Sequence, residues 1–152
     1  MQIRPDKESD LDAIREIDGT IESSTYLHVE PSGESINCGW RLEQRPARQR
    51  IVLPNRLNDD DDFTLKQIVT GAEEGVAMIV EHDDAPAALL LARPDSAVNV
   101  LRILDIRVDS DYRRQGMGTA LVYQTIQAAR EAELRAVAIE TLTSNVPAAE
   151  LL

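Results

Sequence analysis

Apolar residues recur along the chain at two spacings, which predict strands that alternate with helices. Runs of strand character cover residues 2–4, 76–81, 87–92, 98–108 and 135–141. Apolar residues at helical spacing follow Ser9, Asn58, Gly116 and Asn145. The run at 87–92, AALLLA, has no polar residue, so this strand should be covered on both faces. The pattern predicts an α/β (α+β) fold, with a mixed sheet and helices on both faces, in a single domain of residues 1–152.

Residues 20–60 have the least regular pattern in the chain. They predict strands at 25–30 and 36–44, separated by a turn at Pro31-Ser32-Gly33. Cys38 and Trp40 would share one face of the second strand, which favours core packing for both side chains, with contact to the acceptor as the alternative. Pro46 and Pro54 favour an irregular connection after that strand.

The acidic run Asp59–Asp62 follows Asn58 and allows two interpretations. As the first turn of a helix, its carboxylates would interact favourably with the positive end of the helix dipole. The apolar residues Phe63, Ile68 and Val69 follow at amphipathic spacing, which favours this interpretation. The alternative is an acidic lip that attracts an amine.

Composition and charge narrow the classes of function. The 152 residues include 27 Asp and Glu but only 16 Lys and Arg, a net charge of −11, which disfavours general nucleic-acid binding and suits a cationic amine substrate. One cysteine and two histidines provide no metal-ligand cluster. No apolar run approaches the roughly 18 residues of a membrane span, and the N-terminus has no signal-peptide pattern, so a cytoplasmic location is the default expectation.

Residues 101–132 carry the strongest chemical signal. A strand ending in Val108 is followed by a basic loop with two glycines, Arg113-Arg114-Gln115-Gly116-Met117-Gly118, and a helix begins at once. The first turn of a helix has unpaired N–H groups and a positive dipole end, and glycine lets an anion approach the backbone. The segment therefore predicts a phosphate-binding site. It is neither a Walker loop, which needs a lysine, nor a dinucleotide fingerprint, because position 121 is leucine.

Residues 98–151 resemble the acetyl-CoA-binding half of the GNAT N-acetyltransferase superfamily. The resemblance rests on the segment DIRVDSDYRRQGMGTALV, the helix after it, the strand VAIET and the sequence Asn145-Val-Pro-Ala148. The sequence of this half is most similar to the streptothricin acetyltransferase-like branch of the superfamily. The resemblance implies a mostly antiparallel GNAT-like central sheet and acetyl-CoA as the cofactor.

The resemblance also implies the cofactor-binding residues. The backbone N–H groups of the loop would hold the pyrophosphate, and the end of the preceding strand would pair with the pantetheine arm. The residues implied are Ile106, Arg107, Val108, Arg113, Arg114, Gln115, Gly116, Met117, Gly118, Thr119 and Asn145. The residues themselves also indicate a cationic patch around this loop of an acidic chain, made by Arg102, Arg107, Arg113 and Arg114.

Acetyl transfer would proceed by direct attack of an amine on the thioester in a ternary complex. Because an alkylammonium must first lose a proton, a carboxylate should lie nearby. Asp105, inside the central strand, and Glu140, at the end of the next strand, are the candidate catalytic residues. A charge within an apolar strand also needs a partner, so an ion pair of Asp105 with Arg107 or Arg102 is the structural alternative. The N–H of Val108 would polarise the thioester carbonyl.

The sequence departs from the family pattern at its end. The usual general acid, a tyrosine, would fall at Leu152, and the two closing strands of the family would follow. Truncation, a homodimer that completes the sheet and loss of catalysis each explain this departure. The expected function is transfer of acetyl from acetyl-CoA to a small cationic amine, such as an antibiotic or polyamine, or to a protein amine. A non-catalytic CoA-binding or dimerisation module is the alternative.

Overall fold

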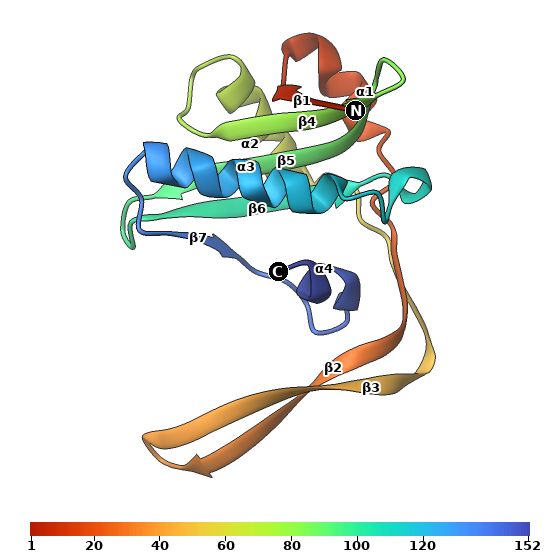
Figure 1. Cartoon of the computed structure of the whole chain (residues 1–152), viewed down its shortest axis with the longest axis vertical. Coiled ribbons are helices and arrows are strands. Elements are labelled where there is room, and N and C mark those ends of the chain that lie inside the picture. Colours follow the sequence, from red (N-terminus) through yellow and green to blue (C-terminus); the bar gives the residue numbers. More distant parts are fainter. The chain divides into compact units, whose positions relative to one another are not determined.

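The computed structural model describes residues 1–152 (Figure 1). The chain divides into two compact units. The first unit comprises Met1–Gly19 and Asn55–Glu140, and the second comprises Thr20–Pro54 and Thr141–Leu152. Organisation as a single domain stays a prediction.

The first unit is built on a five-stranded sheet in the order β1-β4-β5-β6-β7. The strands are β1 (Gln2–Pro5), β4 (Val76–His82), β5 (Ala85–Asp95), β6 (Val100–Val108) and β7 (Ala136–Ile139). Neighbouring strands are antiparallel, except that β6 and β7 are parallel. The helices are α1 (Leu11–Arg15), α2 (Asp59–Val69) and α3 (Met117–Glu131), with short 3-10 turns η1 (Glu8–Asp10) and η2 (Ser110–Tyr112). The predicted mixed, mostly antiparallel sheet is confirmed.

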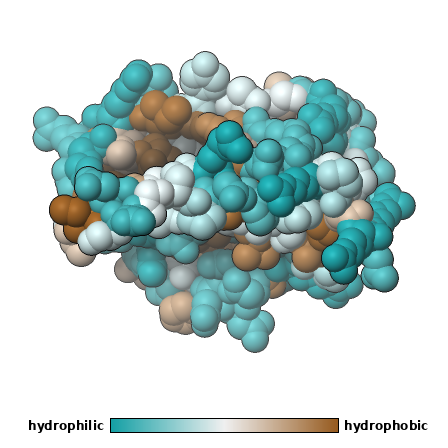
Figure 2. Space-filling view, turned by 90° about the horizontal axis from the view of Figure 1, so that it is seen from below, coloured by the Kyte–Doolittle hydropathy of each residue, from teal (hydrophilic) through white to brown (hydrophobic).

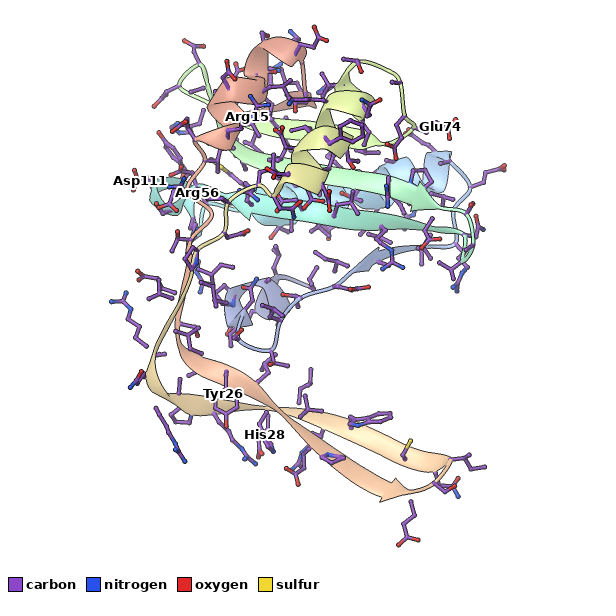
Figure 3. The ribbon with its side chains drawn as sticks, turned by 180° about the vertical axis from the view of Figure 1, so that it is seen from behind. Arg15, Tyr26, His28, Arg56, Glu74 and Asp111 are labelled. Atoms are coloured by element: carbon purple, nitrogen blue, oxygen red, sulfur yellow. The ribbon has the colours of Figure 1, made fainter.

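Helices cover both faces of this sheet, as the pattern predicts (Figures 1 and 3). α3 packs on one face through residues that recur every four positions, Met117, Leu121, Thr125 and Ala129. α1 and α2 pack on the other face through Ile14 and Leu65. Every residue of the apolar run at 87–92 in β5 is buried between the two layers, because its side chains alternate between the α3 face and the α1/α2 face.

The ends of α2 follow from local sequence. The side chain of Asn58 accepts a hydrogen bond from the Asp61 N–H at 2.8 Å, which confirms the predicted helix start. After α2, Gly71 takes a left-handed conformation (φ +78°) in which its N–H donates to the Ile68 carbonyl. The expectation that Phe63 packs inward was wrong, since Phe63 is exposed. Leu65 faces the sheet, and two residues along a helix correspond to about 200° of rotation.

The second unit consists of the hairpin β2 (Ile21–Glu34) and β3 (Asn37–Leu53) together with α4 (Val146–Leu151). The Leu27 N–H in β2 donates to the Thr143 carbonyl, which precedes α4, at 2.9 Å. Both strands are longer than predicted. Pro46 lies within β3 and not in an irregular connection, opposite Thr25 and beside a register shift, whereas Pro54 follows the end of β3.

The two faces of this hairpin differ in chemistry. Cys38 and Trp40 share one face, as predicted, but both are exposed, so the expectation of core packing was wrong. A two-stranded sheet has no second layer of its own to bury that face. On the other face, Tyr26 and His28 make an edge-to-face ring contact (Figure 3), and His28 lies 2.9 Å from the Glu30 carboxylate.

The face drawn in Figure 2 is mostly hydrophilic, with hydrophobic side chains gathered in smaller patches. None of the helices combines the length and apolar character needed to cross a lipid bilayer.

Candidate functional site

The parallel strands β6 and β7 separate part-way along β6. They pair from Val100 opposite Ala136 to Ile103 opposite Ile139, where β7 ends. β6 continues for five more residues to Val108 while paired only with β5. We call the point beside Ile103 and Ile139 the fork. Beyond it, β6 presents an open edge to a ligand.

A β-bulge lies at the fork. Ile103 is opposite Ala92 and Asp105 is opposite Leu91, so Leu104 is an extra residue on β6. The bulge shifts the alternation of side chains, which places Ile106 and Val108 on the α3 face and Asp105 and Arg107 on the α1/α2 face. Strict alternation from Ile103 would have given the reverse. No sequence signal marks this bulge.

The open edge of β6 carries hydrogen-bonding groups of the main chain. On the β5 side, the Asp109 N–H donates to the Ala87 carbonyl at 2.9 Å. Since backbone groups alternate sides along a strand, the N–H and C=O groups of Ile106 and Val108 point to the open edge. There the Arg113 Nε donates to the Val108 carbonyl at 3.0 Å. The Ile106 groups and the Val108 N–H remain available for an extended ligand.

The open edge leads to the glycine loop and the start of α3. Arg114 (φ 62°) and Gly116 (φ 82°) both take left-handed conformations, which turn the chain into the helix. The first hydrogen bond inside α3 runs from the Ala120 N–H to the Gly116 carbonyl, so the N–H groups before Ala120 have no acceptor within the helix. No atom lies within 4 Å of the position that a Cβ on Gly116 would take. This arrangement suits an anion at the helix N-terminus.

Contacts outside the loop hold it in place. Arg113 Nη2 donates to the Asp18 carbonyl at 3.2 Å, and the Asp18 N–H donates to the Asp109 carboxylate at 3.0 Å. Tyr112 packs against His82 of β4 with ring centroids 4.8 Å apart. The loop is thus tied to the segment after α1 and to the β4–β5 hairpin.

The arginines near the loop have separate roles, which corrects the expected four-residue patch. Arg102 lies near the start of β6, six residues before Val108, and pairs with Asp95 at 3.1 Å. Arg107 points to the α1/α2 face, where it is buried and paired with Asp105. Arg113 and Arg114 are the members of the predicted patch that belong to the loop itself.

The ion pair of Asp105 with Arg107 is two-pronged. Arg107 Nε donates to one carboxylate oxygen of Asp105 at 2.6 Å and Nη2 donates to the other at 2.8 Å. Arg107 Nη1 donates to the Asn55 carbonyl at 3.1 Å. The structural alternative for Asp105 is thus realised with Arg107, and a catalytic role for Asp105 stays a prediction.

Asp61, in the first turn of α2, belongs to the same neighbourhood. Burial raises the pKa of the Asp61 carboxyl, and the nearby negative charge of Asp105 raises it further, while Arg107 and the Asn58 hydrogen bond act in the opposite direction. Sequence reasoning treated the acidic run as a whole and did not single out Asp61. Its position four residues before Leu65, on the sheet-facing side of α2, was the available signal.

The other two predicted residues lie at the ends of their elements. Glu140 directly follows β7, at the fork, and its carboxylate lies 2.9 Å from Arg102 while remaining almost fully exposed. In the second unit, the Asn145 side chain accepts a hydrogen bond from the Ala148 N–H at 3.2 Å and so caps α4. Neither observation tests a role in catalysis or cofactor binding.

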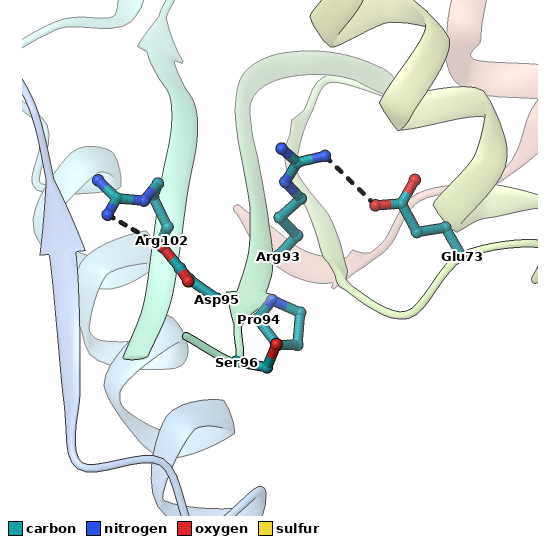
Figure 4. A pocket seen from close by; sticks show the side chains of 6 residues that line it. All are labelled: Glu73, Arg93, Pro94, Asp95, Ser96 and Arg102. Carbon is teal, nitrogen blue, oxygen red and sulfur yellow. Dashed lines mark hydrogen bonds and ion pairs between the residues drawn. The ribbon is translucent and has the colours of Figure 1, made fainter. Parts of the chain in front are cut away.

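A surface pocket of about 370 Å³ lies at the opposite end of β5 and β6 from the loop (Figure 4). Its charged side chains are paired: Arg93 lies 3.5 Å from Glu73, and Arg102 lies 3.1 Å from Asp95. Pro94 and Ser96 complete the lining. The paired charges give this pocket no free group for chemistry, so it is not the candidate site.

Solved structures with similar folds are acetyltransferases. Nourseothricin acetyltransferase matches with a TM-score of 0.74 and 22% identity, over 97% of this chain and 76% of that chain. A putative streptothricin acetyltransferase from Bacillus anthracis str. Ames was solved in complex with acetyl coenzyme A. It matches with a TM-score of 0.73 and 22% identity, over 98% of this chain and 79% of that chain. The ribosomal-protein-S18-alanine N-acetyltransferase from Escherichia coli matches with a TM-score of 0.58 and 18% identity, over 99% of this chain and 72% of that chain.

No curated protein matches the sequence significantly. The acetyltransferase (GNAT) family profile matches residues 40–152, which is most of the chain and includes the fork, the open edge and the glycine loop. The chain therefore belongs to the GNAT family of acetyltransferases.

Proposed function

We propose that this protein transfers an acetyl group from acetyl-CoA to the primary amine of a small cationic acceptor. The observation that carries the proposal is the open edge of β6, which runs from the fork towards the start of α3, where the first N–H groups have no acceptor within the helix. Acetyl-CoA contains, in succession, a pyrophosphate, an extended arm with two amides and a terminal thioester. The start of α3, the open edge of β6 and the fork follow one another in the same order.

The cofactor would use mainly the main chain of the protein. The pantetheine amides would pair with Ile106 and Val108 as an added strand does. The N–H groups from Arg114 to Thr119 would hold the pyrophosphate. Arg113 would act by fixing the loop to the Val108 carbonyl. Asn145 would contact the pantetheine arm, as the resemblance to the family implies.

The chemistry would be direct attack of the amine on the thioester within a ternary complex. The Ile106 N–H, which lies nearer the fork than the Val108 N–H expected from the sequence, would stabilise the negative charge that develops on the carbonyl oxygen, and Val108 would pair with the pantetheine arm. Glu140 would attract the ammonium group to the fork. Asp105 would hold Arg107 in place, since Arg107 occupies both of its carboxylate oxygens.

A cationic acceptor is supported by the net charge of −11 and by two of the structural neighbours, which are named for nourseothricin and streptothricin. Polyamines share the same chemistry. A protein amine is the other acceptor class, and a ribosomal-protein alanine acetyltransferase is among the neighbours.

Calorimetric titration with acetyl-CoA tests the cofactor site. The wild type should bind, and Gly118→Trp should not, because a large side chain in the first turn of α3 would fill the pyrophosphate position. Circular dichroism would show that the variant is folded. No binding by a folded wild-type sample would refute the proposal.

A thiol-release assay with a panel of polyamines, aminoglycosides and streptothricin-type antibiotics then tests turnover. Release of CoA with at least one amine supports the enzyme. Tight binding of acetyl-CoA without release on any amine would favour the non-catalytic module.

We also propose that a second copy of the chain completes the sheet. β7 is at the edge of the sheet order, so its outer side is unpaired, and an exposed strand edge pairs readily with another strand. Sedimentation velocity should detect a dimer that Ala136→Lys weakens. A monomer at all concentrations would refute it.

A further inference from the structure

We propose that Asp61 accepts the proton that the acceptor ammonium must lose before it attacks the thioester. This inference rests on the proposed acetyl transfer and assigns a residue to its first step. It concerns one aspartate of the run Asp59–Asp62 and not the run as a whole.

The geometry of α2 sets Asp61 apart from its neighbours. Asp61, Leu65 and Ile68 follow a spacing of four and then three residues, so they lie on one side of the helix. Leu65 is fully buried and Ile68 packs in the same cluster, so this side faces the sheet. Asp59 and Asp60 are exposed to solvent.

The position of the Asp61 carboxylate is fixed by Asn58. The Asn58 Oδ1 accepts from the Asp61 N–H at 2.8 Å, and the Asn58 Nδ2 donates to the Asp61 Oδ2 at 2.7 Å. No ion pair holds this carboxylate, so one oxygen stays available to an ammonium group.

The neighbouring carboxylates are already occupied. Both oxygens of Asp105 accept from Arg107. Asp62 pairs with Arg15 and with Lys66. Glu140 pairs with Arg102. Asp61 interacts electrostatically with Asp105 and Arg107 of β6, and unlike Asp105, Asp62 and Glu140 it is held by no ion pair.

The charges that face Asp61 come from β6 and from its own helix. Asp105 and Arg107 face it from the sheet, and Asp60 lies beside it in α2. Burial and the two aspartates favour the neutral acid and together outweigh Arg107 and the Asn58 amide, so the pKa of Asp61 is raised. A carboxylate with a raised pKa is a stronger base near neutral pH than an ordinary aspartate.

The ammonium R–NH₃⁺ gives one proton to an Asp61 oxygen, and the freed lone pair forms the C–N bond at the thioester carbon. The C–S bond breaks with its electron pair on sulfur. The second proton lost by nitrogen passes to the CoA thiolate, and the proton on Asp61 returns to water, so the products are an amide, CoA thiol and one proton.

The test compares Asp61→Asn with the matched control Asp60→Asn, which removes the same charge from the exposed side of the same turn. The wild-type kcat/KM for the best amine in the panel should rise with pH through an acid limb as Asp61 loses its proton. Asp61→Asn should lose that limb and fall about a hundredfold or more. Asp61→Glu should recover part of the activity. Acetyl-CoA affinity should stay unchanged in all three variants, and a cooperative thermal unfolding transition would show that each variant is folded.

Three results would overturn the inference. An Asp61→Asn enzyme with the wild-type kcat/KM and acid limb would refute Asp61 as the proton acceptor while the transferase assignment stands. An equal loss in Asp60→Asn would show that the run acts only through its overall charge. Absence of thiol release from a wild type that binds acetyl-CoA would refute the proposed transfer itself and this step with it.

Discussion

Thr119→Glu separates the stability of α3 from its capacity to bind an anion. Thr119 is exposed and occupies the third position of the helix, directly before the residue whose N–H makes the first intrahelical hydrogen bond. A glutamate there is favourable for the helix, because its charge lies beside the positive end of the dipole. The same charge lies where the pyrophosphate of the cofactor is expected.

The two effects have opposite signs and different sizes. The dipole interaction should stabilise the fold by about 0.3–1 kcal/mol. Two unit charges roughly 6 Å apart repel by about 0.7 kcal/mol in water and about 2.8 kcal/mol near a protein surface. A pyrophosphate carries about two such charges, so binding should weaken by at least about 1.4 kcal/mol, or tenfold.

Thermal unfolding and calorimetry with acetyl-CoA measure the two quantities on the same sample. The matched control is Gln127→Glu, which adds the same charge at an exposed position farther along α3. Thr119→Glu should keep or raise the Tm and lose at least tenfold in affinity, with a smaller loss in 0.5 M salt because the repulsion is screened. Unchanged affinity in a folded Thr119→Glu protein would refute the placement of the pyrophosphate at the start of α3.

Three further predictions concern stability. Burial raises the pKa of Asp6 to about 7, so the folded state favours the neutral acid and the protein loses stability as the pH rises from about 4 through 7. Asp6→Asn should therefore leave the free energy of unfolding unchanged at pH 4 and raise it by about 1–2 kcal/mol at pH 8, as measured by urea unfolding. Arg107→Leu leaves the half-buried Asp105 without its partner and should destabilise the protein by about 3–5 kcal/mol, with much of that loss recovered when Asp105→Asn is added. Asn145→Ala removes the cap of α4 and should cost about 1 kcal/mol in the same assay, and a loss of acetyl-CoA affinity beyond twofold would support the predicted pantetheine contact.

Several features follow from the sequence alone because their causes are local. The four-residue spacing of buried positions in α3 and the apolar run of β5 determine which surfaces must be covered. The glycine loop between a strand and a helix start indicates an anion site, since helix N–H groups have no internal acceptor in any context. The cap by Asn58 is equally local, because donor and acceptor lie within three residues.

Other features were decided by tertiary structure. The bulge at Leu104 depends on how β6 registers against β5, and it determines that Asp105 and Arg107 face α2 rather than α3. The sequence did not show whether Arg102 or Arg107 is the ion-pair partner of Asp105, because both arginines lie within three residues of it along the chain. The exposure of Trp40 depends on whether a second layer covers its hairpin.

The same distinction applies to the proposed chemistry. Sequence predicted the cofactor loop because phosphate binding uses the backbone of one continuous segment. It did not single out Asp61, because the environment of that carboxylate comes from a strand more than forty residues away, brought close only when α2 packs on the sheet. Local structure is encoded in short segments, whereas the protonation and pairing of a side chain depend on every element that folds against it.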